Sequence, residues 1–184
     1  MKKISLIFIF IPILYFSTAF ADQRETELNK LFNQLKIIDD SILAMKIEMK
    51  IWSIWTTHPS QKDLTELMMS GSVFMSENKL EKAYYIFSEI IKIDPIWAEA
   101  WNKRATVLYL LGKYQESQND IDQVLKLENR HFGALSGQGL VQTELGNYFR
   151  AINSYKDVQK IYPSMNAPKI MIPLLEELID REFI

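Results

Sequence analysis

A repeat of 34 residues organises the middle of this 184-residue chain. Eight positions carry similar residues at that spacing through three consecutive units without a gap, at residues 64–97, 98–131 and 132–165. In the first unit these positions are Gly71, Asn78, Leu80, Ala83, Phe87, Ile90, Ile93 and Pro95. Self-similarity at a period of this length is typical of stacked structural repeats, in which each unit buries its apolar face against the next.

Each unit is predicted to form two antiparallel helices. In the central unit, Ala105 is a small residue at the point of the first helix where a neighbouring helix has to approach closely. This helix is expected to end at Gly112, because Gly and Asn adopt the left-handed backbone of a helix C-terminus at little cost. Ile121, Val124 and Leu127 then follow at three-residue steps along one face of the second helix. The pattern predicts an all-α solenoid.

The columns resemble the tetratricopeptide repeat (TPR) family, whose pattern is W-x2-L-G-x2-Y, then A-x3-F, then P. The matching residues are Trp101 and Ala105 in the central unit, Gly71, Phe74, Ala83, Phe87 and Pro95 in the first, and Gly139, Ala151, Tyr155 and Pro163 in the third. The resemblance implies three TPR helix hairpins, with first helices that line a concave surface where a segment of another protein binds. The chain also looks like small exported repeat proteins of gram-negative bacteria, which implies a periplasmic setting.

The flanks are expected to form caps. Residues 22–60 are predicted to be a divergent helical pair that closes the N-terminal end of the stack, with a break at Asp39-Asp40-Ser41. Its apolar residues recur at helical spacing: Leu28, Leu31, Phe32, Leu35, Ile38, Ile42, Met45, Met49 and Trp52. Residues 166–184 are predicted to be a capping helix, with Pro168 and Pro173 at first-turn positions. Its expected inward-facing residues are Leu174, Leu175, Leu178 and Ile179.

Residues 1–21 have the order of a secretory signal peptide. Lys2 and Lys3 precede an uncharged run of 13 residues, and the segment ends in Ala19-Phe20-Ala21. At about 1.5 Å per residue that run falls short of a hydrocarbon core of roughly 30 Å, which argues against the alternative of a retained anchor helix. We therefore expect cleavage after Ala21, a periplasmic or secreted protein, and no membrane insertion after cleavage.

Composition excludes several kinds of chemistry. The chain has no cysteine, which removes disulfides, thiolate nucleophiles, iron–sulfur clusters and a lipid-modified cysteine. The only histidines, His58 and His131, are far apart in sequence and are predicted to be surface or capping residues. We expect no catalytic residue, cofactor or metal. Loss of the signal segment changes the formal charge from −2 to −4, so nucleic acid is not an expected partner.

The resemblance to the family, carried over by position, implies a groove on the first helices. Its predicted lining residues are Met68, Ser72, Met75, Asn102, Lys103, Thr106, Tyr109, Ser136, Leu140 and Thr143. Packing between the units is the alternative role for each of them. Family members that clamp a C-terminal carboxylate use several Lys, Arg and Asn residues, whereas Lys103 is the one basic residue here. The methionines, Tyr109 and Leu140 instead favour an apolar or helical partner segment.

Arg104 stands where the family has leucine, and Asp120 lies on the facing second helix of the same unit. The same two columns read Ser70 with Ile86 in the first unit and Gln138 with Ser154 in the third, so charge appears on both sides together. We interpret Arg104 and Asp120 as a structural ion pair. A basic residue that holds an acidic peptide is the alternative.

The sequence thus predicts a periplasmic, non-enzymatic protein that binds a partner segment in its concave groove. The alternative is a structural or assembly subunit of a cell-envelope complex, docked through the convex side or through the N-terminal helix of Trp52 and Trp55. Homo-oligomerisation through an uncovered end is a further possibility.

Overall fold

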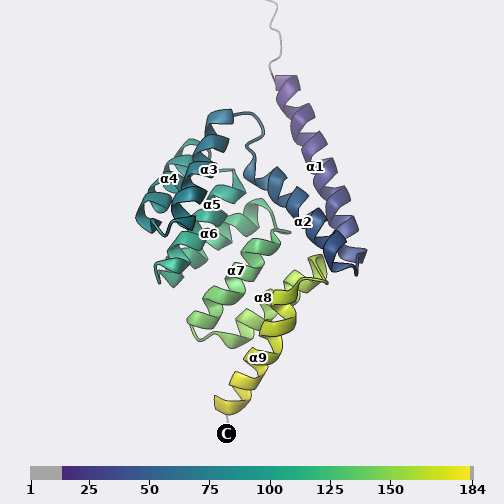
Figure 1. The fold of residues 1–184 in the computed structure, drawn as a ribbon, viewed down its shortest axis with the longest axis vertical. Coiled ribbons are helices and arrows are strands. Elements are labelled where there is room, and N and C mark those ends of the chain that lie inside the picture. The colour runs from purple at the N-terminus through teal and green to yellow at the C-terminus, as the bar shows by residue number, and fades with distance from the viewer. Residues whose placement is uncertain (1–13, 183–184) are drawn as a thin grey trace, which may run out of the picture.

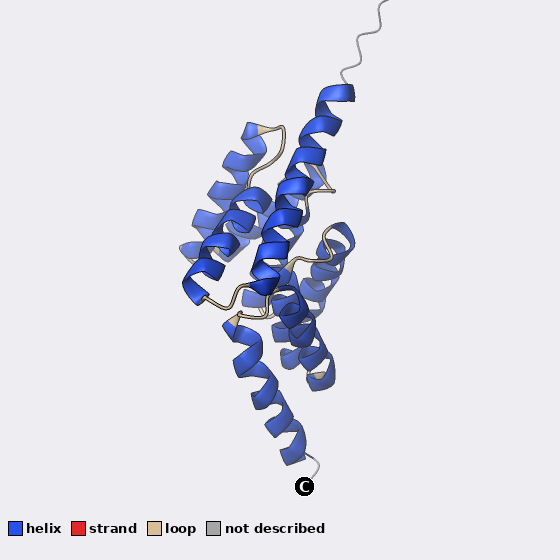
Figure 2. Cartoon of the chain, turned by 90° about the vertical axis from the view of Figure 1, so that its right-hand side faces the viewer, coloured by secondary structure: helices blue, strands red, loops and turns tan. Residues whose placement is uncertain are grey.

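The computed structural model describes residues 14–182, which form nine helices and no strand (Figure 1, Figure 2). The all-α prediction is confirmed for this part of the chain. The helices are α1 (Leu14–Ile37), α2 (Ser41–Thr56), α3 (Lys62–Ser76), α4 (Leu80–Ile93), α5 (Ala98–Leu110), α6 (Tyr114–Leu127), α7 (Phe132–Glu144), α8 (Tyr148–Ile161) and α9 (Asn166–Glu182). Of the predicted signal peptide, residues 1–13 lie outside the described residues, and α1 runs through the predicted cleavage position.

Three helix hairpins, α3–α4, α5–α6 and α7–α8, follow one another with the same turn. At the end of α5, Gly112 has φ 72° and its N–H donates to the carbonyl of Tyr109 at 2.9 Å, while Lys113 N–H donates to Leu108 at 2.9 Å. This pair of bonds closes the helix end and needs a left-handed residue. Asn78, with φ 56°, occupies the same place in the preceding hairpin. Asn78 and Gly112 therefore stand where the turn needs a left-handed backbone, which Asn and Gly adopt at little cost.

Within each hairpin the two helices approach closely where the sequence has its small-residue column. A Cβ atom added at Gly139 would lie 2.5 Å from the ring of Tyr155, and one at Gly71 would lie 2.6 Å from the ring of Phe87. Both rings are completely buried. The glycines thus leave the space that the large aromatic side chains of the second helices fill.

The C-terminal helix α9 packs on α8, where Leu175 is fully buried in one cluster with Ala151 and Tyr155. Two details differ from the sequence prediction. Pro173 lies inside α9 and not in its first turn, and Leu174 is exposed. The packing of Leu175 and its apolar neighbours against α8 holds the helix through the proline.

The sequence predicted that the N-terminal hairpin α1–α2 closes the end of the stack beside α3 and α4. In the structure the hairpin packs elsewhere. Its apolar side chains form one cluster with residues of the third repeat, α7 and α8: Phe132, Leu135, Val158 and Tyr162. Asp40 caps the start of α2 by accepting hydrogen bonds from the N–H groups of Ile42 and Leu43. The hairpin thus packs against α5, α8 and the N-terminal part of α7 (Figure 1).

Candidate functional site

Two tryptophans of α2 attach the N-terminal hairpin to the start of α7. The ring of Trp55 stacks on His131 with centroids 3.9 Å apart, and Trp52 packs edge-on against Phe132 at 5.4 Å. A Cβ atom at Gly133 would lie 2.6 Å from Trp52, so this glycine makes room for the indole. Trp55 is buried and Trp52 is half-buried. The two side chains are therefore engaged inside the molecule, which corrects the suggestion that they form a docking face.

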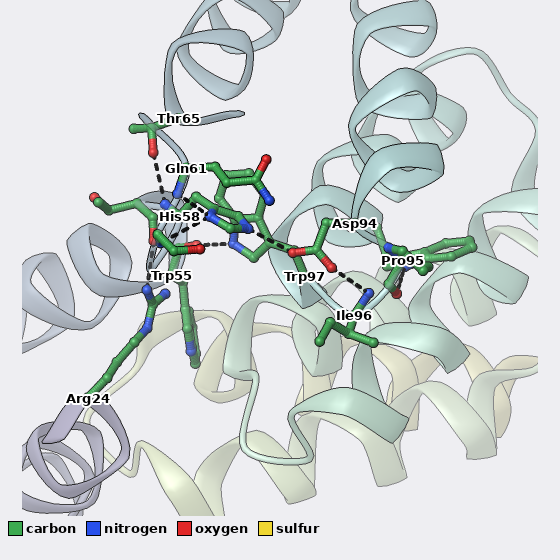
Figure 3. A network of polar contacts seen from close by, with 12 residues as sticks. Arg24, Trp55, His58, Gln61, Thr65, Asp94, Pro95, Ile96 and Trp97 are labelled. Atoms are coloured by element: carbon green, nitrogen blue, oxygen red, sulfur yellow. Dashed lines mark hydrogen bonds and ion pairs between the residues drawn. The ribbon is translucent and has the colours of Figure 1, made fainter. Parts of the chain in front are cut away.

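A polar network fixes the connection between α2 and the first repeat (Figure 3). The indole N–H of Trp97 donates to the carbonyl of Trp55 at 2.8 Å. The guanidinium of Arg24 donates to the carbonyls of Ile54 and Thr57 at the end of α2. Because these carbonyls end a helix and have no partner within it, the bonds satisfy groups that would otherwise be unpaired.

Both histidines are buried, and only His131 is a helix cap, at the start of α7, whereas His58 lies in the loop before α3. His131 Nδ1 accepts from the N–H of Ala134 at 3.0 Å, which leaves the ring proton on Nε2, 3.0 Å from the carboxylate of Glu99. The His58 ring has similar partners within its loop: its Nδ1 accepts from the N–H groups of Ser60 and Gln61, and its Nε2 lies 2.7 Å from Asp94 (Figure 3). Both nitrogens of each ring are thus committed to structural bonds.

Glu99 is almost completely buried and organises the start of α5. Besides His131, its carboxylate accepts from the amide of Asn102 at 3.0 Å and lies 3.4 Å from the Nζ of Lys103. The Lys103 ammonium also lies over the Trp52 ring, 5.6 Å from its centroid. The one basic residue predicted for the groove is therefore neutralised by Glu99 and covered by α2.

Farther along α5 and α7, side chains of both helices are exposed. A small pocket of about 60 Å³ lies between the two helices, and four of the predicted groove residues line it: Asn102, Thr106, Tyr109 and Leu140. Thr106 and Leu140 are exposed, whereas Asn102 is buried and hydrogen-bonded to Glu99. We call the exposed surface of Thr106, Tyr109 and Leu140 the open groove.

Tyr109 forms one wall of the open groove. Its hydroxyl donates to Glu144 on α7 at 3.4 Å, and its ring packs against Tyr114 with centroids 5.6 Å apart. Burial, and then the Glu144 carboxylate, raise the pKa of Tyr109 above its ordinary value. The phenol therefore stays neutral and offers an apolar face with a hydroxyl at its edge.

The other predicted groove residues lie apart from this pocket. Met68 is 1% exposed and packs in the core of the first repeat, so it does not face an open groove. Ser72 and Thr143 donate their hydroxyls to backbone carbonyls one turn earlier in their own helices. Met75 packs against the first-repeat core, and Ser136 is half-buried on α7.

Arg104 and Asp120 contact each other directly. Arg104 Nε and Nη2 donate to the two carboxylate oxygens of Asp120 at 2.7 and 2.8 Å, and Nη1 donates to Ser88 Oγ at 3.2 Å. The bond to Asp120 raises the pKa of Arg104 although burial opposes it. The guanidinium thus bridges the second helices α4 and α6.

Sequence reasoning missed Glu99 and the covering of the groove by α2. The signal for Glu99 was an acidic residue near the start of α5, which looks like an ordinary solvent-exposed first-turn residue. Sequence reasoning also gave Gly133 no packing role, although the absence of a side chain there makes room for the ring of Trp52. Within residues 14–182, no group of three or more His, Asp or Glu side chains is placed to hold a metal ion. None of the described helices has the length and apolar character needed to cross a membrane.

Comparison with known proteins identifies the repeats. The tetratricopeptide repeat family pattern matches residues 98–131 and 134–164. A TPR repeat-containing protein of Rhizobium etli is 33% identical over 150 residues, which are 82% of this chain and 73% of that protein.

Solved structures agree with this result. The Sgt2 TPR domain of Aspergillus fumigatus superposes with a TM-score of 0.63 at 17% identity, over 66% of this chain and 82% of that one. The first TPR domain of Spaghetti (RPAP3), bound to an HSP90 peptide, superposes with a TM-score of 0.62 at 17% identity, over 64% and 93% of the two chains. These likenesses confirm the predicted solenoid and, at such identities, speak for the fold alone.

Proposed function

Because the chain belongs to the tetratricopeptide repeat family, we propose that it is an exported, non-enzymatic adaptor that binds a segment of another protein in the open groove. The observation that carries the proposal is the pocket between α5 and α7, where Leu140 and Thr106 are exposed beside the ring of Tyr109. The RPAP3 domain, whose structure was solved with a peptide, shares this fold.

The chemistry of the open groove favours an apolar or helical segment over an acidic C-terminus. A carboxylate clamp needs cationic side chains that are available to the ligand. Lys103 is instead paired with Glu99 and packed over Trp52. At the far end of the groove, Glu144 adds a negative charge beside Tyr109. An apolar side chain of the partner would fit against Leu140 and the Tyr109 ring, because the removal of these apolar surfaces from water is favourable.

The absence of enzymatic activity is part of the proposal. Catalytic histidines need a ring nitrogen directed at substrate, whereas both nitrogens of His58 and His131 bind protein groups. The carboxylates of Asp94 and Glu99 bind these two rings and so are also engaged in structural bonds. In the open groove, the hydroxyl of Thr106 donates to the backbone carbonyl of Asn102 in its own helix.

Export to the periplasm or the cell exterior rests on the N-terminal sequence pattern. Arg24 and the apolar residues from Leu28 onward attach the N-terminal hairpin, and removal of residues 1–21 keeps all of these side chains. Intact-mass measurement on protein from a periplasmic fraction tests this point. We expect a chain that begins at Asp22, and an uncleaved chain in the membrane fraction would contradict it.

Site-specific photo-crosslinking in cells tests the proposed groove. A photoreactive residue at Leu140, 38% exposed, is compared with one at Leu127, 42% exposed at the end of α6 and outside the groove. We expect one partner segment to crosslink at Leu140 and not at Leu127. A synthetic peptide of that segment should bind the wild type and the Leu127→Asp variant, and should bind Leu140→Asp at least about tenfold more weakly. Equal binding by both variants would overturn the proposal.

A specific observation supports the alternative, an assembly subunit docked through its convex side. Tyr85 on α4 and Phe149 on α8 are each 65% exposed on second helices. Large aromatic side chains at such exposure are common anchors of protein interfaces. The same crosslinking experiment with photoreactive residues at Tyr85 and Phe149 distinguishes the two functions, because convex docking predicts partner adducts there and none at Leu140.

A further inference from the structure

The contact between the first and second repeats contains an internal arginine site. The guanidinium of Arg104 donates to Asp120 and to Ser88, and it lies over the rings of Tyr84 and Trp101, with 5.7 and 4.9 Å to their centroids. The second helices of the two repeats supply the polar partners and Tyr84. This site shows how the scaffold holds a guanidinium between neighbouring repeats.

The same place between the second and third repeats is a pocket. Each residue of the arginine site has a counterpart 34 positions later. Gln138 corresponds to Arg104, Ser154 to Asp120, Asp122 to Ser88 and Gln118 to Tyr84. All four counterparts line a cavity of about 280 Å³. The remaining lining residues are Gln142, Arg150, Asn153 and Asp157. The pocket shares no lining residue with the pocket of the open groove. The shorter glutamine thus leaves space where the preceding repeat carries an arginine.

We propose that this pocket binds a guanidinium group from outside the chain. The acidic partner has changed sides: the carboxylate of Asp122 on α6 stands where Ser88 stands on α4, and the hydroxyl of Ser154 stands where Asp120 does. One carboxylate and one hydroxyl therefore face the site in both contacts. A planar group with five N–H donors matches such a set of acceptors.

Buried and partly buried hydrogen bonds hold the wall of the pocket in place. Gln142 Nε2 donates to Gln118 Oε1 at 2.7 Å, and Gln118 Nε2 donates to Asp122 Oδ1 at 2.8 Å. On the opposite wall, Ser154 Oγ donates to Gln138 Oε1 at 2.9 Å. Gln118, Gln142 and Ser154 are each more than nine-tenths buried. Because these side chains are already ordered, a ligand meets a preformed polar site and loses little entropy of ordering on binding.

The negative charge available to a cation comes from Asp122. The lining holds the carboxylates of Asp122 and Asp157 and the guanidinium of Arg150. Asp157 is also paired with Lys160, with Nζ 2.6 Å from Oδ1. Asp122 is therefore the group on which the affinity for a guanidinium depends most directly.

A guanidinium reaches such a pocket from one of two sources, an arginine side chain of a protein or free arginine. Arg150 at the pocket distinguishes them, because free arginine brings a carboxylate that this guanidinium can bind. N-acetyl-arginine amide represents the side chain alone. Citrulline has the same shape with a neutral urea group and serves as the control ligand.

Calorimetric titration of the full chain tests the proposal. We expect N-acetyl-arginine amide or L-arginine to bind, with the tighter of the two identifying the source, and citrulline to bind at least about tenfold more weakly. Asp122→Asn should weaken binding at least about tenfold, whereas the matched control Glu116→Gln, an exposed acidic residue of the same helix, should not. No binding, equal binding of citrulline, or an unchanged affinity in Asp122→Asn would overturn the proposal.

A second variant fills the pocket from within. Gln138→Arg places in the third repeat the residue that the second repeat has at Arg104, within reach of Asp122 and Ser154. We expect this variant to lose guanidinium binding while its melting temperature is kept or raised. Retained binding in a folded Gln138→Arg protein would show that the ligand lies elsewhere and would refute the proposal.

Discussion

Replacement of Arg104 by leucine should be among the most destabilising single changes in the second repeat. The two side chains of the pair are 17% and 6% exposed, and Asp120 receives both of its short bonds from Arg104. The substitution leaves a buried carboxylate without its cation, which costs about 3 kcal/mol at the lower end of the range for broken buried pairs. At about 2–4 °C for each kcal/mol in a chain of this size, the melting temperature should fall by roughly 6–12 °C.

The assay is urea unfolding followed by circular dichroism, with calorimetry for the melting temperature. The double variant Arg104→Leu/Asp120→Ile takes the residue that the first repeat has at Ile86 and removes the stranded charge. It should recover more than half of the lost free energy of unfolding, because an apolar pair of similar volume often replaces a buried ion pair without loss. A single variant within about 0.5 kcal/mol of the wild type would refute the reasoning.

Three further substitutions test the packing described above. Burial and then Glu48 raise the pKa of Tyr162 to about 12, and the folded protein therefore holds a proton that the unfolded chain loses near pH 10. Stability should fall as the pH rises from 10 to 12, and Tyr162→Phe should reduce that fall in urea midpoints measured at pH 9 and 11.5. Gly139→Ala should cost about 1–3 kcal/mol in urea unfolding, because its Cβ would meet the Tyr155 ring at 2.5 Å. Gly133→Ala should displace the Trp52 ring and expose the α1–α2 hairpin to limited proteolysis before the repeats unfold.

Gly137 offers a matched control for both glycine variants. A Cβ atom there would have its nearest neighbour at 3.7 Å, an ordinary contact with Ile121. Gly137→Ala should therefore be neutral or stabilise α7 by up to about 1 kcal/mol. If Gly139→Ala were tolerated equally well, α7 and α8 would not approach as closely as described. An unchanged proteolysis pattern in Gly133→Ala would show that Trp52 does not hold the hairpin.

The repeats were predictable because each depends on contacts that recur every 34 residues. Gly112 marks a turn through its own backbone conformation, and Gly139 marks a close approach to a residue only 16 positions away, Tyr155. Such local rules survive in a single sequence. The position of the α1–α2 hairpin was not predictable, because it depends on partners such as Phe132 and Tyr162, which lie far along the chain and follow no period.

The groove was predicted only in part for a related reason. A column position states which side of a first helix a residue occupies, and it does not state what covers that side. Met68 and Asn102 occupy the same position in consecutive repeats, and both are buried. Met68 packs in the apolar core of its own repeat, whereas Asn102 is hydrogen-bonded to the buried Glu99. Tyr109 is half-buried and Leu140 is exposed, so both keep accessible surface at the pocket between α5 and α7.

Helix α7 contributes to both proposed sites, and its geometry lets the two proposals fail separately. Gln138 and Gln142 are four positions apart and share one side of the helix, whereas Leu140 lies two positions from each, about 200° around the axis. Leu140→Asp should therefore weaken binding of the partner segment and leave guanidinium binding unchanged. Gln138→Arg should do the reverse. If either change altered both affinities, α7 would shift as a rigid rod between its neighbours, and the groove and the pocket would be coupled through it.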